Sequence, residues 1–268
     1  MLKTYPSRAV SAAPSDTRRQ LVVFFSLLLV YALLAFLLVA TGLQETQGAQ
    51  LGMPASQMPA SALVMGLANA GLILVGYGLL GLAGYWFARR LGLPGIFRPG
   101  AGWRAWLVTP LWVGALVGLV MILGDRLFSA LGQVQGFPHP AFPASLIAAA
   151  TAGIGEEIMF RLFVMSLWAF LLHLILRRWK GRSLALWIGN LIGALAFGAG
   201  HLPAVMFLYN VTNPADLPGL VLGEVFLLNG VLGLVAGERY LRDGLVAAAG
   251  VHFWADILWH VLFPLLTL

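Results

Sequence analysis

Long apolar runs alternate with short polar segments along the whole chain, and this pattern predicts the elements. A transmembrane helix needs about 20 mainly apolar residues to cross the hydrocarbon core of a bilayer. We therefore expect an all-α fold, a polytopic transmembrane helical bundle of about seven spans, with an eighth short or re-entrant segment possible in the long loops. The apolar runs lie near residues 21–40, 62–87, 105–124, 144–176, 184–203, 218–236 and 244–266.

The lengths and flanks of these runs suggest how the chain is organised. The run 144–176 is too long to cross squarely, so we expect it to be tilted, or to begin as an extended or interfacial stretch. The first run follows a basic tail without a convincing cleavage site, which indicates an uncleaved signal anchor. We divide the chain into a cytoplasmic tail (1–20), N-terminal transmembrane helices (21–143) and a C-terminal transmembrane core (144–268).

Composition supports a membrane protein and excludes several other classes. Hydrophobic residues make up 60% of the chain and charged residues only 10%, whereas soluble domains carry about 25% charged residues. The formal net charge is +6, but the basic residues cluster at the ends of apolar runs, so we expect contact with a lipid bilayer and no nucleic acid. The absence of cysteine excludes thiol catalysis and thiolate metal sites.

The basic residues also predict an orientation. Of the 16 Lys and Arg residues, all except Arg126 and Arg161 fall in loops or tails on one side of a seven-span arrangement, which leaves 14 on that side. Because basic loops stay in the cytoplasm, we expect a cytoplasmic N-terminus in an integral protein of a prokaryotic inner membrane. Trp259 and His260 lie near the end of the last run, and we interpret them as interfacial belt residues.

Glycines recur at close spacing in the second run, at positions 76, 78, 81 and 84. Small residues on one helix face allow neighbouring helices to approach closely. The pattern therefore predicts a helix-packing face.

Charged residues inside the fourth run are the first sign of chemistry. A charge at the bilayer centre costs about 2.5–3.5 kcal/mol on insertion scales. Glu157 and Arg161 are four residues apart, so they share a helix face and can pair, while Glu156 lies about 100° round the helix. A structural ion pair needs only one acid, so the second acid favours a functional site.

Two further runs carry polar residues of the same kind. The fifth contains Phe197 and His201, and the seventh contains His252 and Asp256, which at a spacing of four residues face the same way. If the three runs pack around one cavity, a carboxylate can deprotonate water there, while the imidazoles bind or protonate a reacting carbonyl. Glu224 and Asn229 either line such a cavity or pair with neighbours, whereas Asp125, Arg126 and His139 fall in an outer loop and indicate nothing specific.

Together these residues resemble a known family. The order E-E-x-x-x-R, then F-x-x-x-H, then H-x-x-x-(N or D) is similar to that of the CAAX protease and bacteriocin-processing family, which includes CAAX prenyl endopeptidases. The resemblance covers the chain from about residue 144 to 262. The matching positions within it are Glu156, Glu157, Arg161, Phe197, His201, His252 and Asp256.

The resemblance implies a helical membrane protease and a role for each residue. Glu156 would activate water with help from His201, and His252 and Asp256 would bind the oxyanion. Glu157 and Arg161 would hold the site in shape or contact substrate. Prenyl endopeptidases typically have asparagine where this chain has Asp256; an ionised aspartate only accepts hydrogen bonds, so it must be protonated or must orient His252.

We therefore expect an intramembrane endopeptidase, without a cofactor, that cleaves a membrane-associated protein or peptide. A Zn²⁺ enzyme with Glu156, His201 and His252 as ligands is a competing hypothesis. Against it, the two histidines lie on different runs, and the Arg161 cation would repel a metal ion. Two non-enzymatic functions also fit a buried polar site in a membrane, namely a transporter and a non-catalytic scaffold.

Overall fold

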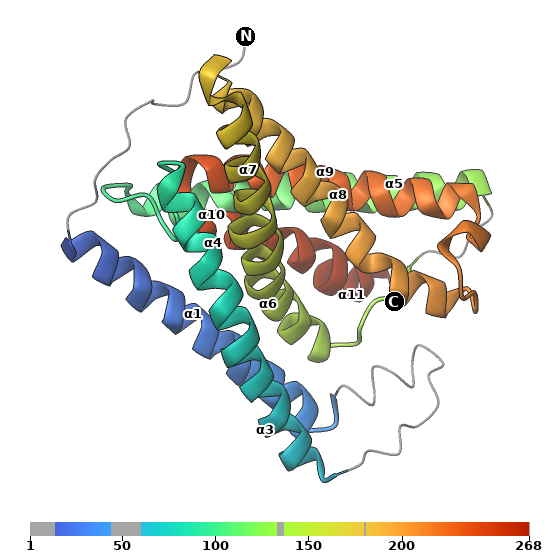
Figure 1. The fold of residues 1–268 in the computed structure, drawn as a ribbon. Helices are drawn as coiled ribbons and strands as arrows, with labels where there is room; N and C mark the ends of the chain where they lie inside the picture. Colours follow the sequence, from blue (N-terminus) through green and yellow to red (C-terminus); the bar gives the residue numbers. More distant parts are fainter. Residues whose placement is uncertain (1–13, 44–59, 133–136, 180, 268) are drawn as a thin grey trace.

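The computed structural model describes residues 14–43, 60–132, 137–179 and 181–267, and within these ranges the chain is helical, with no strand (Figure 1). Among the described residues, seven stretches of helix are long and apolar enough to span a membrane, which confirms the predicted bundle. Four of the short elements, η1, η2, η3 and η6, are π-helical, and η4 and η5 are 3₁₀ turns. In chain order the elements are α1 (Pro14–Ala40), α3 (Ala62–Leu72), η1 (Ile73–Tyr77), α4 (Gly78–Arg90), η2 (Arg104–Val108), α5 (Thr109–Gly132), α6 (Ala144–Glu157), η3 (Ile158–Met165), α7 (Ser166–Leu176), η4 (Arg177–Trp179), α8 (Arg182–Leu208), η5 (Pro214–Asp216), α9 (Gly219–Asp243), α10 (Leu245–Asp256), η6 (Ile257–Leu262) and α11 (Phe263–Thr267).

Two spans differ in detail from the sequence prediction. The third continues to Gly132, so Asp125 and Arg126 lie in helix α5 and not in an outer loop as predicted. The fourth is helical from Ala144 to Trp179, 36 residues in all, so the predicted extended start is wrong. At 1.5 Å per residue it is about 54 Å long, well beyond the roughly 30 Å of a hydrocarbon core. A tilted crossing remains the prediction for this span.

The last span forms the centre of the bundle. Helix α10 packs against α5, α6 and α9. In the most apolar part of the span Leu245–Thr267, 56% of the residues are buried, compared with 17% in Ala62–Arg90. Helices α1, α3 and α4 form a layer on one side, where α1 contacts α6 and α4 contacts η3 (Figure 1). The most buried span therefore lies in the C-terminal half, while the N-terminal half contributes residues such as Phe24, Leu28 and Met121 to the same core.

One buried glutamine ties the N-terminal layer to this core. Gln20 on α1 is fully buried, and its amide nitrogen donates to the carbonyl oxygens of Pro94 (2.9 Å) and Phe97 (3.0 Å). Its amide oxygen accepts from the backbone N–H of Ile96 at 2.8 Å. The carbonyl of Ile96 in turn accepts from Val246 at the start of α10 (2.9 Å). The end of the predicted tail 1–20 is therefore helical and braces the core.

Glycines permit the closest helix crossings, as the sequence pattern predicted. A Cβ atom added to Gly84 would clash with the backbone carbonyl of Leu162 in η3, and one added to Gly81 would clash with the Phe24 ring. Gly76 is different, because nothing lies within 4 Å of its added Cβ. The packing interpretation therefore holds most strictly for Gly81 and Gly84, while an added Cβ atom at the buried Gly78 would make ordinary contact with Leu28 at 3.5 Å.

We predict that Gly84→Ala lowers the thermal unfolding midpoint of the detergent-solubilised protein, because the backbone of η3 must move to admit the methyl group. Gly76→Ala, the same change on the same span, should leave the midpoint unchanged or raise it. Differential scanning fluorimetry of both variants tests this. Equal midpoints for the two variants would contradict the close crossing.

Candidate active site

Two π-helical turns begin directly after the acidic residues of the predicted motifs. Glu157 ends α6 and is followed by η3, and Asp256 ends α10 and is followed by η6. A π turn inserts an extra residue into a helix and is frequent at functional sites. Here each turn changes the direction of the side chains that follow it, next to a buried carboxylate.

Glu157 and Arg161 form the predicted pair in a fully buried position. The Arg161 Nε atom lies 3.2 Å from Glu157 Oε2, and the two residues have an exposed fraction of 0%. The guanidinium also stacks over the ring of Phe197 on α8, 4.6 Å from the centroid. Such a cation–π contact is stronger when it is desolvated. The pair therefore joins the fourth span to the fifth.

The imidazole of His252 lies among three carboxylates. Its Nδ1–H donates to Glu157 Oε1 at 2.8 Å. Its Nε2 atom is 3.5 Å from Asp256 Oδ2 and 3.8 Å from Glu156 Oε2. Because an ionised carboxylate only accepts, the short contact assigns a hydrogen to Nδ1. Glu157 is thus the main hydrogen-bond partner of His252, a role that the sequence suggested for Asp256.

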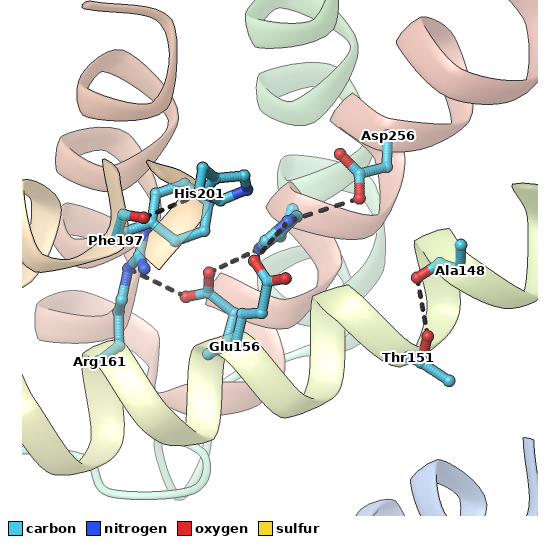
Figure 2. A network of polar contacts seen from close by, with 9 residues as sticks. Ala148, Thr151, Glu156, Arg161, Phe197, His201 and Asp256 are labelled. Atoms are coloured by element: carbon cyan, nitrogen blue, oxygen red, sulfur yellow. Dashed lines mark hydrogen bonds and ion pairs between the residues drawn. The ribbon is translucent and has the colours of Figure 1, made fainter. Parts of the chain in front are cut away.

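His201 is held by its own helix. Its Nδ1–H donates to the carbonyl oxygen of Phe197 at 2.9 Å. A carbonyl only accepts, so Nδ1 carries the hydrogen and Nε2 keeps its lone pair when the ring is neutral. Figure 2 shows Glu156, His201 and Asp256 directed toward a common space from three different helices.

These side chains line one cavity of about 330 Å³. The Glu156 side chain is 34% exposed, whereas that of Glu157 is completely buried. The two adjacent acids therefore have different environments, and only Glu156 is accessible to a molecule in the cavity. The structure thus brings together the residues that the sequence singled out, namely Glu156, His201, His252 and Asp256, with Phe197 beside them.

The structure also adds cavity residues for which the sequence pattern indicates a different role. Trp259 is only 7% exposed, and both it and His260 line the cavity, so their assignment to an interfacial belt is wrong. Trp259 and His260 lie seven and eight residues after His252, a spacing that predicts the same helix face. This spacing is the sequence signal from which their place at the cavity could have been predicted.

His139 reaches the site from the segment before α6. Its Nδ1 atom is 2.9 Å from Nδ1 of His260, so one ring donates to the other. Burial, with a contribution from His260, lowers the pKa of His139 from its ordinary value to about 4. His139 is therefore neutral near pH 7. No local pattern in the sequence indicates this contact, because the two histidines are 121 positions apart.

No group of three His, Cys, Asp or Glu side chains within the described ranges is arranged to hold a metal ion. The alternative zinc ligands Glu156, His201 and His252 therefore do not form such a group. The Nε2 atom of His252 already faces Asp256 as well as Glu156, and its Nδ1–H is bonded to Glu157.

Fold and site together define a polytopic helical membrane protein with a carboxylate–imidazole cluster inside the bundle. Residues 138–258 match the family described as type II CAAX prenyl endopeptidase Rce1-like. The matched segment contains all of the motif residues, and the match supports the resemblance to the CAAX protease family that these motifs suggested. No curated protein and no solved structure gave a match to the chain.

Proposed function

We propose that the protein is an intramembrane endopeptidase in which Glu156 activates water. The observation that carries the proposal is the accessibility of Glu156 at a cavity that His201 and His252 also line. A general base must reach the proton that it removes, and only this member of the acid pair does so. The family match to CAAX-type endopeptidases supports the same chemistry.

The reaction uses the cavity residues in two stages. Glu156 takes a proton from water, with the free Nε2 atom of His201 accepting a hydrogen bond from the same water, and the oxygen attacks the peptide carbonyl. The carbon–nitrogen bond then breaks as Glu156 returns the proton to the leaving amine. The products are a carboxylic acid and an amine.

His252 stabilises the oxyanion of the tetrahedral intermediate. We infer that its ring is an imidazolium, because carboxylates approach both of its nitrogens. Its Nε2–H then donates to the oxyanion, so Asp256 does not need to supply the hydrogen bond that an asparagine would give. Asp256 instead attracts the imidazolium, and Glu157, itself paired with Arg161, fixes the orientation of the ring. Glu157 is in this sense a positioning residue.

We predict that Glu156→Gln lowers peptide cleavage by about 10²–10⁴-fold, the usual contribution of a general base. The variant keeps the shape of the side chain, so the thermal unfolding midpoint should not fall. Cleavage is measured by comparing protein termini in membranes of cells that carry either form. The control is Glu238→Gln, which changes an acid of α9 paired with Arg242 outside the cavity. Unchanged termini in Glu156→Gln would refute Glu156 as the base.

We also predict that catalysis needs no metal ion, because the acids and imidazoles of the site already contact one another. The purified protein should keep its activity after treatment with a membrane-compatible chelator, and elemental analysis should find no stoichiometric zinc. Activity lost on chelation and restored by Zn²⁺ would reassign Glu156, His201 and His252 as ligands.

The N-terminus is proposed to lie in the cytoplasm, since most basic residues flank one end of the spans. The chain has no native cysteine, so single reporters are clean probes. Gln50→Cys and Thr212→Cys should react with an impermeant maleimide from outside intact cells, and Lys180→Cys only after lysis. The reverse pattern would invert the orientation.

A further inference from the structure

The catalytic groups occupy only part of the cavity, and helix α9 contributes a second polar wall. Glu224 and Asn229 both line the cavity, with exposed fractions of 3% and 8%. The amide nitrogen of Asn229 donates to the carbonyl of Val225 at 2.8 Å, which leaves its oxygen as the unused atom. The Oε1 atom of Glu224 has no hydrogen-bond partner in the described part of the chain. This wall therefore presents acceptors.

A second acid reinforces the wall from α5. Asp125 is 4% exposed and its carboxyl group lies beside that of Glu224. Its Oδ1 atom accepts a hydrogen bond from the backbone N–H of Phe137 at 3.4 Å. No described Lys or Arg forms an ion pair with either acid. The negative charge of this pair is thus not compensated by an arginine, as that of Glu157 is by Arg161.

A purely structural role leaves this arrangement unexplained. Two carboxyl groups in hydrogen-bond contact can share one proton, which leaves the pair with a single negative charge. The Oε1 atom of Glu224 still has no donor in the described part of the chain, and a buried acceptor without a donor is destabilising. An acid pair that served only to join α5 to α9 would be sealed between the helices, but Glu224 faces the cavity. The wall therefore lacks a partner that brings both positive charge and hydrogen-bond donors.

One further unpaired group lies on the same cavity. The indole N–H of Trp259 is buried without a hydrogen-bond partner in the described ranges, and Trp259 is more than nine-tenths buried. An unpaired donor and unpaired acceptors on the walls of one cavity match an extended peptide, whose carbonyl groups accept and whose basic side chains donate.

We propose that Glu224 and Asn229, with Asp125 behind Glu224, form a subsite that binds a positively charged nitrogen group of the substrate, an ammonium or a guanidinium. The proposal rests on the endopeptidase function above and specifies its substrate class: a peptide with a Lys or Arg side chain at a fixed distance from the cleaved bond. The apolar remainder of the cavity accommodates the neighbouring residues.

Binding of a small cation tests the subsite without any cleavage. The probe is benzylammonium, with neutral benzyl alcohol as its match in size. The full-length protein is reconstituted in nanodiscs, and saturation-transfer NMR measures the dissociation constants. We expect benzylammonium to bind saturably to the wild type and to Glu156→Gln, and at least about tenfold more weakly to Glu224→Gln, the loss typical of a charge-assisted hydrogen bond.

Glu238→Gln on the same helix is the control and should bind like the wild type. If Glu224→Gln does not fold, Asn229→Leu removes an acceptor from the same wall and should weaken binding severalfold. Equal binding of benzylammonium and benzyl alcohol, or no loss in the folded wall variant, would overturn the subsite.

Cleavage gives a separate readout. Sites that depend on Glu156 should carry Lys or Arg at one fixed position, and Glu224→Gln should remove that preference. Guanidinium and ammonium preferences are separated by the ratio of Arg to Lys at that position. If no termini depend on Glu156 but benzylammonium binds as expected, the endopeptidase proposal fails and the cation subsite stands. If Glu156-dependent sites exist but carry no basic residue at a fixed position, the endopeptidase proposal stands and the cation subsite fails.

Discussion

The chain of buried charges from Arg161 through Glu157 to His252 is the interaction on which the rest of the site depends. It runs from Arg161 Nε to Glu157 Oε2 at 3.2 Å and from Glu157 Oε1 to His252 Nδ1 at 2.8 Å. Each group is costly alone in an apolar interior, and here their opposite charges offset one another. The hydrogen bonding is less complete, because Glu157 Oε2 and the three side-chain nitrogens of Arg161 are buried without a hydrogen-bond partner in the described part of the chain. Because the chain links the fourth span to the seventh, it also fixes where Glu156 can stand. Glu156, the proposed base, is left outside this chain of charges and is exposed to the cavity.

Close helix crossings bring the charged groups into register. Gly114 and Gly118 on α5 meet the backbone of α10 at Val251 and Ala255, and Gly84 meets the backbone of η3. Larger residues at these crossings would push the helices apart by more than the tolerance of a hydrogen bond. The polar contacts of the cavity therefore depend on the glycines, because the glycines set the distances between the helices that carry the polar residues.

The sequence predicted the spans and the convergence of the motif residues, because apolar length and buried charge are local signals. It predicted the pairing of His252 with Asp256, which lie 3.5 Å apart, because their spacing is visible along one helix. It missed the shorter contact of His252 with Glu157, because that contact depends on how two helices rotate against each other. The contact of His139 with His260 could not be predicted from the sequence either, because it joins segments that are 121 positions apart. The extent of α5 was underestimated because Asp125 reads as the start of a loop until the acid beside it is known.

The hydrogen bonds of Gln20 have a consequence for how such proteins diverge. The segment that matches the family begins at residue 138. The turn around Ile96, which contacts the start of α10, is held by the side-chain amide of Gln20, 118 positions before that segment begins. The matched segment 138–258 therefore depends on a side chain outside it for the position of α10. In relatives with a different N-terminal half, some other side chain must supply two donors and an acceptor at this turn. The N-terminal helices can therefore change in sequence only if another side chain makes the hydrogen bonds that Gln20 makes here.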